Sequence, residues 1–143
     1  MAYTVKEFAA LFGVSPHTVR YYTDIRLLPT PRDGANRRIL DDESANWMQG
    51  IMCLKGCGAS IEDIREYCAL CLLDETEENL RARYRIILQQ REKAHERLEE
   101  AQRVAAYMDE KVLHYEDILA GRSEDDSNPA KWTPETRPAI HAK

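Results

Sequence analysis

Near its N-terminus the sequence reads Gly13-Val14-Ser15-Pro16-His17-Thr18-Val19-Arg20-Tyr21-Tyr22, and the class of fold follows from this stretch. Ser15 followed by Pro16 predicts a helix start, because a serine hydroxyl accepts a hydrogen bond from the first turn and proline there has no N–H to leave without a partner. Gly13 favours the left-handed end of a preceding helix. Two helices joined by so short a turn are typical of a helix-turn-helix unit, whose second helix we expect from about Pro16 to Ile25.

The helix before this turn has a clear start. Thr4 and Glu7 have the spacing of a capping box, in which each side chain accepts a hydrogen bond from the other residue's backbone N–H. Apolar side chains then recur at helical spacing, at Val5, Phe8, Ala9 and Phe12. We therefore expect the first helix to begin at residue 4 or 5 and to end at Gly13.

A basic hairpin is expected after the second helix. Proline at 29 and 31 disfavours helix, and Asp33-Gly34 is a strong signal for a hairpin turn. The far arm of this two-stranded wing reads Arg37-Arg38-Ile39-Leu40. Between residues 14 and 40 five arginines are balanced by only two aspartates, a local charge of +3 in a chain whose formal charge is −5. This stretch therefore offers the positive potential that nucleic-acid binding requires.

Two more helices complete the N-terminal unit. Asp41-Asp42 can cap a third helix that runs to about Lys55, where glycines end it. Ser60-Ile61-Glu62-Asp63 is an acidic variant of the capping box and opens a fourth helix toward Cys71. We expect residues 1–72 to form a compact winged helix-turn-helix domain.

A heptad pattern runs through most of the second half. Its members are spaced alternately four and three apart, and all but one are apolar: Leu80, Tyr84, Ile87, Arg91, Ala94, Leu98, Ala101, Ala105, Met108, Val112, Tyr115 and Leu119. This seam predicts one helix over residues 74–120, with Asp74 as its N-cap. At about 1.5 Å per residue the helix is roughly 70 Å long, too long to bury its seam on so small a domain. A partner is required, and a second copy of the chain is the simplest one.

The rest of the sequence narrows the class of protein further. Residues 121–143 lose the periodicity, so we expect a largely irregular tail, in which Trp132 marks a docking point. The longest apolar stretch, residues 67–73, is far shorter than the roughly 18 to 20 residues that cross a bilayer. The start of the sequence also lacks the apolar core of a signal peptide. We expect a cytoplasmic, all-α protein that spans no membrane.

In combination these motifs resemble the mercury-resistance regulator (MerR) family. The similarity extends over roughly residues 1–120 and is carried by residues 3–9, 13–22, 27–29, 38 and 58–64. Members of the family resemble one another in dimerising through an antiparallel coiled coil, which fits the long helix. The resemblance implies a homodimeric regulator, neither an enzyme nor dependent on a cofactor, that binds a pseudo-palindrome in an overlong promoter spacer. Distortion of that DNA then lets RNA polymerase engage both promoter elements.

The resemblance also assigns DNA contacts by position. Arg20, Tyr21 and Tyr22 on the recognition helix and Arg38 on the wing match contact positions, His17 and Thr18 are candidate base readers, and Lys55 is a candidate phosphate contact. The complete expected set is Ser15, His17, Thr18, Arg20, Tyr21, Tyr22, Arg37, Arg38 and Lys55. The wing departs from the family, which has aromatic residues where this chain has Arg37 and Leu40.

The cysteines separate the branches of the family. Its metal sensors resemble one another in carrying paired cysteines after the dimer helix, and this sequence has none beyond Cys71, so we expect no metal site. Residues 52–55, 58–64 and 115–119 resemble the thiol-dependent branch that answers aldehydes or nitrosative stress. In that branch a cysteine at the position of Cys53 is the proposed sensor, and a thiolate near Lys55 could add to an electrophilic carbonyl. The alternative is a small core residue on the third helix.

Other functions stay open from the sequence. A regulator of this type could instead bind a small hydrophobic molecule reversibly near Trp132 and the end of the coil. Cys68 and Cys71 form a CxxC pair that could serve a thiol redox enzyme, or a zinc site together with Cys53 and Cys57, although burial on a helix is the simpler interpretation. A coiled-coil adaptor would function without residues 1–72.

Overall fold

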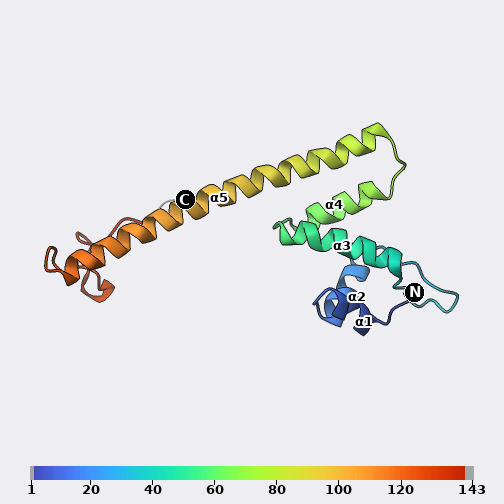
Figure 1. Ribbon diagram of the computed structural model, residues 1–143, viewed down its shortest axis with the longest axis horizontal. Coiled ribbons are helices and arrows are strands. Elements are labelled where there is room, and N and C mark those ends of the chain that lie inside the picture. Colours follow the sequence, from blue (N-terminus) through green and yellow to red (C-terminus); the bar gives the residue numbers. More distant parts are fainter. Residues whose placement is uncertain (1, 141–143) are drawn as a thin grey trace. The chain divides into compact units, whose positions relative to one another are not determined.

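The computed structural model describes residues 2–140, and its regular structure there is helical (Figure 1). The helices are α1 (Val5–Leu11), α2 (Pro16–Asp24), α3 (Asp42–Gly56), α4 (Ile61–Cys71) and α5 (Glu77–Leu119), followed by a short 3-10 helix over Pro129–Lys131. No strand is present among residues 2–140, which confirms the all-α fold class. Contacts divide the chain into two units, one ending at Ala94 and one beginning at His95, so that the division falls inside α5.

The first helices start where their caps predict. At α1 the N–H of Glu7 donates to Thr4 Oγ1 (3.1 Å) and the N–H of Thr4 donates to Glu7 Oε2 (2.8 Å), which confirms the capping box. The hydroxyls of Ser15 and Ser60 accept from the first turns of α2 and α4. Gly13 has the left-handed backbone conformation, φ +64°, that the turn between α1 and α2 requires. The helix-turn-helix is therefore specified locally by its sequence.

The start of α5 differs from the prediction. The N–H of Asn79 donates to Thr76 Oγ1 (3.1 Å), so Thr76 is the cap and Asp74 is not. Asp74 instead lies two residues before the cap, where its carbonyl oxygen accepts from Thr76 N (2.8 Å) and from Asn79 Nδ2 (2.9 Å). The Asp74 backbone thus closes the loop before the helix, and its side chain caps nothing.

The wing is a hairpin loop without the two strands expected. Its arms share one antiparallel bridge, between Arg32 and Arg38, and the N–H of Ile39 donates to Pro31 O (2.9 Å). Prolines have no N–H to donate to a ladder, so pairing cannot extend along the first arm. The left-handed residue of the turn is Asn36 (φ +60°), not a glycine, so the turn lies later in the loop than Asp33-Gly34 indicated.

One hydrophobic core holds the first unit together. Its largest buried side chains are Phe8, Val19, Leu27, Leu28, Met48, Ile51 and Ile64, which come from all four short helices and the turn after α2. In that turn Arg26 has a positive φ of 59°, and the N–H groups of Leu27 and Leu28 both donate to Tyr22 O (2.9 and 3.0 Å). The tight turn directs both leucines inward and fixes the end of α2 against the core.

A polar cluster joins α4 to the first part of α5. The Asp63 carboxylate accepts from Gln90 Nε2 (2.9 Å) and from Lys93 Nζ (3.2 Å), both on α5, and the Gln90 side chain is buried. The hydrogen bond from Gln90, followed by that from Lys93, holds the pKa of Asp63 below its ordinary value. Asp63 is therefore the residue on α4 that orients the start of the long helix.

Replacing Asp63 by alanine is expected to lower the free energy of unfolding by roughly 1–3 kcal/mol at neutral pH, because charge-assisted hydrogen bonds are lost. Since the folded pKa is depressed, this stabilisation is fully present above the ordinary pKa of aspartate and is lost as the pH falls through the lowered value. Urea unfolding at several pH values measures both effects.

The matched control for this prediction is Glu62→Ala, because Glu62 also lies in the first turn of α4 but is exposed. Both substitutions remove one negative charge near the positive end of the helix dipole. Equal destabilisation by the two variants would show that the dipole, and not the contact with α5, accounts for the effect of Asp63.

In the second unit the tail is attached to the end of α5 by polar contacts. Trp132 Nε1 donates to the carbonyl oxygen of Asp126 (2.7 Å), and the Asp126 carboxylate lies 2.6 Å from His114 Nε2 on α5. The Arg122 side chain donates to Asp117 (2.8 Å). The Trp132 indole thus binds within the tail itself, and the contacts that reach α5 are those of Asp126 with His114 and of Arg122 with Asp117.

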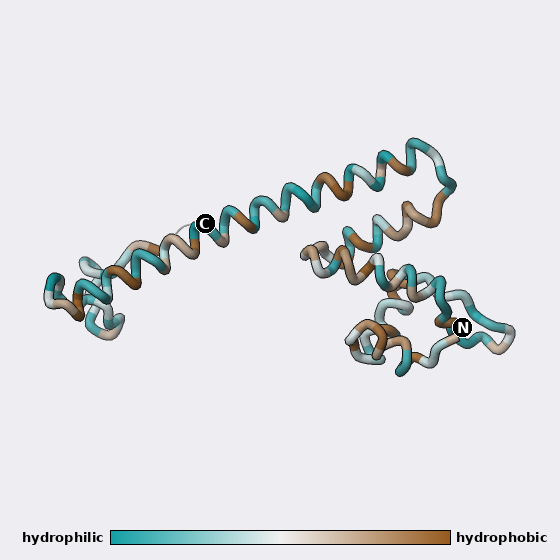
Figure 2. The backbone as a smooth tube through the Cα atoms, in the orientation of Figure 1, coloured by the Kyte–Doolittle hydropathy of each residue, from teal (hydrophilic) through white to brown (hydrophobic). Residues whose placement is uncertain are grey.

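The long helix exposes an apolar stripe. Leu98, Met108 and Val112 are about half exposed, and Figure 2 shows apolar positions recurring between hydrophilic ones along α5. They are members of the heptad seam, which the single chain does not cover. None of the helices over residues 2–140 has the combination of length and apolar character that crossing a membrane demands.

Candidate nucleic-acid interface

The second helix of the turn, α2, has one buried face and one exposed face. Val19 and Tyr22, three residues apart, are 1% and 4% exposed and belong to the core. His17, Arg20 and Tyr21 are exposed on the other side of the helix. Positions i, i+3 and i+4 lie on one side of a helix, so these three side chains form one row. The second helix of a helix-turn-helix presents such a row to a DNA groove.

Tyr22, also among the expected DNA contacts, does not join this row, because its side chain is only 4% exposed. Its ring lies in the core, 6.0 Å from the ring of Tyr21, and its carbonyl oxygen anchors the turn after α2. The sequence offers two adjacent tyrosines, and only the helical phase set by Val19 distinguishes the inward one from the outward one. The buried Tyr22 side chain thus holds α2 against the core, and the exposed Tyr21 carries the hydroxyl that can contact a phosphate.

Ser15 and Thr18 engage each other at the start of α2. The N–H of Thr18 donates to Ser15 Oγ (3.1 Å), and the two hydroxyl oxygens are 3.0 Å apart. Thr18 is half-buried and Ser15 is exposed. Both residues therefore fix the first turn of α2.

The two arginines of the wing have different environments. Arg38, 25% exposed, forms an ion pair with Asp24 at the end of α2, whereas Arg37 is 78% exposed and pairs with Asp33 within the turn (3.0 Å). The pKa of Asp33 is held below its ordinary value, first by the hydrogen bond from the backbone N–H of Arg37. Arg38 thus ties the wing to the recognition helix, and Arg37 is the wing cation that reaches solvent.

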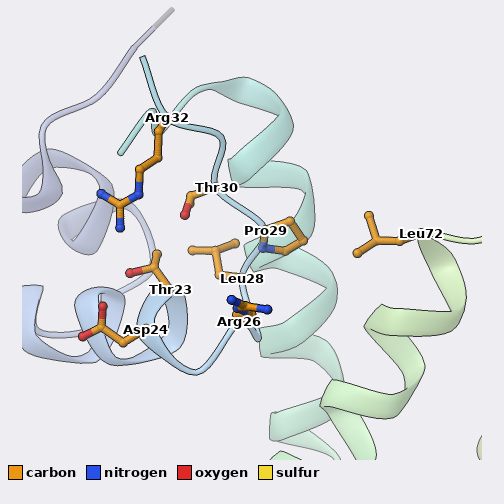
Figure 3. Close-up of a pocket in the computed structure, with 8 residues that line it drawn as sticks. All are labelled: Thr23, Asp24, Arg26, Leu28, Pro29, Thr30, Arg32 and Leu72. Carbon is orange, nitrogen blue, oxygen red and sulfur yellow. The ribbon is translucent and has the colours of Figure 1, made fainter. Parts of the chain in front are cut away.

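A cavity of about 500 Å³ lies beside α2. Its lining includes Arg26 and Arg32, which are outside the set of expected DNA contacts. Figure 3 shows Thr23 and Asp24 at the end of α2, with Arg32 reaching toward them from the wing and Arg26 on the turn below Pro29. The signal for both arginines was present in the sequence as the basic stretch. Their positions depend on the turn geometry after α2, which spacing alone does not give.

Lys55 and Cys53 both lie exposed in the last turns of α3. Residues two apart on a helix do not face each other, so the activation of Cys53 by Lys55 that the sequence suggested lacks geometric support. The polar contact recorded for the Cys53 thiol is with Gln49 Nε2, at 3.7 Å. Cys57, one turn later, is also exposed. Cys53 is therefore an accessible thiol and not a core residue.

The other two cysteines are on α4. Cys68 is buried, and burial raises the pKa of its thiol to about 11, so the thiolate that redox exchange requires is scarce at neutral pH. This argues against the CxxC redox enzyme. Among residues 2–140 no three His, Cys, Asp or Glu side chains are grouped as metal ligands are, so the four-thiolate zinc site is not supported.

Comparison with known proteins agrees with the helix-turn-helix assignment. Residues 3–71 match the family model described as MerR HTH family regulatory protein. A Listeria monocytogenes structure assigned to the MerR family of transcriptional regulators is 30% identical, with a TM-score of 0.68 over 83% of this chain and 89% of that one. HiNmlR, described as a MerR family regulator lacking the sensor domain and bound to promoter DNA, is 28% identical, with a TM-score of 0.66 over 84% and 94% of the two chains.

A curated relative, the HTH-type transcriptional regulator AdhR of Bacillus subtilis, is 31% identical over 62% of this chain and 63% of its own length. Across the curated relatives that it matches, the chain spans between 49% and 63% of their length. The fold and the exposed row on α2 define a helix-turn-helix protein with a basic wing. Within that class, the chain belongs to the MerR family.

Proposed function

We propose that this chain is a DNA-binding transcriptional regulator that acts as a homodimer in the cytoplasm. Each protomer places α2 in the major groove of one half of a pseudo-palindromic promoter spacer, and the wing contacts the adjacent phosphates. When activated, the dimer distorts the spacer so that RNA polymerase engages both promoter elements. Contacts to the DNA backbone supply the energy of that distortion.

The observation that carries the proposal is the division of α2 into two faces. The inward face, Val19 and Tyr22, fixes the helix on the core, and the outward face presents His17, Arg20 and Tyr21, which are all exposed. An arginine can form two parallel hydrogen bonds with a guanine or a phosphate, and a phenol can donate to a phosphate. A helix with only a structural role does not require an exposed arginine, Arg20, between the exposed side chains of His17 and Tyr21.

The homodimer is supported by the stripe on α5. Its apolar members are exposed in the single chain and follow an unbroken heptad pattern, which is the pattern of coiled-coil partners. A two-fold dimer also matches the two halves of a pseudo-palindrome. The proposed arrangement of the two helices is antiparallel.

We assign the inducing signal to an aldehyde or another electrophile that reacts with Cys53. The thiol is exposed on α3, which packs on the core that also carries α2. In the reaction the sulfur bonds to the carbonyl carbon, the C=O π bond opens, and the thiol proton ends on the carbonyl oxygen to give a hemithioacetal. The step is redox-neutral and needs no co-reactant.

Transcription in vitro from the promoter next to its own gene, with purified RNA polymerase and formaldehyde, tests this function. We expect a several-fold increase in transcript with the wild-type protein and no increase with Cys53→Ser. The matched control is Cys57→Ser, since Cys57 is exposed at the C-cap of α3, four residues further along the chain.

The outcomes separate the parts of the proposal. An aldehyde response that survives in Cys53→Ser would contradict the sensor assignment. If all three proteins bind the promoter and ignore the aldehyde, the inducer is of another class, and reversible ligands become the next candidates. Failure of the wild-type protein to bind any promoter fragment would overturn the regulator itself.

A further inference from the structure

A second cavity lies on the first unit, away from the exposed face of α2. It has a volume of about 320 Å³ and is formed by α3, α4 and the start of α5. Its walls are the aromatic rings of Trp47 and Tyr67, the side chain of Ile51, and the polar groups of Cys71, Glu75 and Arg83. Cavities of this size, apolar with a few polar groups, are at the small end of those that hold ligands.

Arg83 is the unusual member of this lining. Its side chain is only 20% exposed, and its Nε is enclosed without a hydrogen-bond partner among the described residues. One terminal nitrogen, Nη1, is 3.8 Å from Cys71 Sγ, and the other, Nη2, is 3.6 Å from a Glu75 oxygen. The first contact is a weak one to sulfur, and the second is longer than a hydrogen bond.

The guanidinium is thus largely removed from water while its donors are poorly satisfied. A guanidinium carries five N–H donors in a planar fork, and burial of such a group is costly unless it is paired. Glu75 supplies only part of the pairing, because its carboxylate is 83% exposed and its oxygen lies 3.6 Å from Nη2. A carboxylate accepting from Nε and one terminal nitrogen together is the group that matches the fork.

We propose that this cavity binds a small aromatic carboxylate, whose anionic group pairs with Arg83 while its ring lies against Trp47 and Tyr67. The inference rests on the proposed regulatory function and gives it a reversible effector site distinct from Cys53. A ligand there contacts α3, α4 and α5 at once, so its binding energy couples the DNA-binding domain to the dimer helix.

Benzoate is the probe, and the fluorescence of Trp47 is the readout. The protein has two tryptophans, so the Trp132→Phe variant of the full chain leaves Trp47 as the only one. We expect benzoate to change its emission saturably and benzamide, the uncharged isostere, to have no comparable effect. Arg83→Gln is expected to weaken benzoate binding at least about tenfold, the loss of a charge-assisted hydrogen bond.

Two further variants make the test specific. Arg85→Gln removes the same charge from an exposed position on the same helix and is expected to leave the affinity unchanged. Glu75→Gln removes the carboxylate that competes for Arg83 and is expected to tighten benzoate binding. A purely structural role of Arg83 would not produce this gain.

Three results would overturn the proposal: equal responses to benzoate and benzamide, no saturable response to benzoate, or wild-type affinity in Arg83→Gln. If Arg83→Gln loses helicity, the Glu75→Gln variant provides the test instead. An affinity for benzoate that is unchanged in Glu75→Gln would contradict the proposed site. Promoter binding by the same proteins without benzoate is measured separately. Loss of promoter binding with benzoate binding intact would count against the regulatory function and not against the cavity.

Discussion

Replacing Arg20 by alanine is expected to weaken binding to the promoter fragment at least tenfold, with no change in the unfolding temperature. Arg20 is exposed at the centre of the row on α2, and no hydrogen bond or ion pair of its side chain is recorded within the first unit, so the fold does not depend on its side chain. Loss of an arginine that contacts a base or a phosphate costs a factor of this size at each half-site. Fluorescence anisotropy with a labelled promoter fragment measures the affinity.

The matched control for Arg20 is Arg85→Ala, which removes an equal charge from an exposed position on α5. Both variants lower the positive charge of the chain by one, so a general electrostatic effect would weaken both equally. Equal affinities of the two variants would mean that α2 is not the reading helix. Thermal unfolding followed by circular dichroism shows that neither variant has lost its fold.

Replacing Leu98 by glutamate is expected to convert the proposed dimer to monomers and to abolish promoter binding at protein concentrations where the wild type binds fully. Leu98 belongs to the heptad seam and is 54% exposed in the single chain, so the substitution costs little before association. In the proposed dimer we expect this position to be buried, where an unpaired carboxylate would be strongly unfavourable. Sedimentation equilibrium reports the change in the dimer dissociation constant, for which we expect two orders of magnitude or more.

The control for the seam is Gln102→Glu, which introduces the same charge one turn further along the helix at an exposed position off the heptad pattern. It is expected to sediment as a dimer and to bind the promoter as the wild type does. A dimeric Leu98→Glu protein would show that the chains associate through some other surface.

The parts of the fold that depend on neighbouring residues could be predicted from the sequence. The capping box at Thr4 and the serine caps of α2 and α4 are each satisfied by a backbone N–H three residues away, so their pattern is complete in the sequence. The long helix is likewise predicted from the spacing of apolar residues that are close together in the sequence. The wing is predicted less well from the sequence. Two paired strands need backbone N–H donors along the first arm, and Pro31 has none.

The candidate DNA interface could be predicted in part. The exposed row on α2 follows from helical spacing once Val19 is placed in the core, and the same phase turns Tyr22 inward; that Val19 faces the core is decided by packing between the helices. Arg26, which has a left-handed backbone conformation, and Arg32 of the wing line one cavity with the end of α2, an arrangement that residue spacing does not reveal. The pairing of Arg83 with Cys71 joins residues on different helices, and no local signal marks it.

Binding to promoter DNA tests the central claim most directly, namely that a dimer of this chain reads DNA through α2. The measurement is a titration of the promoter fragment next to its own gene and of a shuffled fragment of equal length, at several salt concentrations. We expect two protomers per specific fragment, an affinity that falls steeply with salt, and binding to the shuffled fragment weaker by at least a thousandfold, roughly the least that separates specific from non-specific sites. Equal and weak binding to both fragments would contradict the claim.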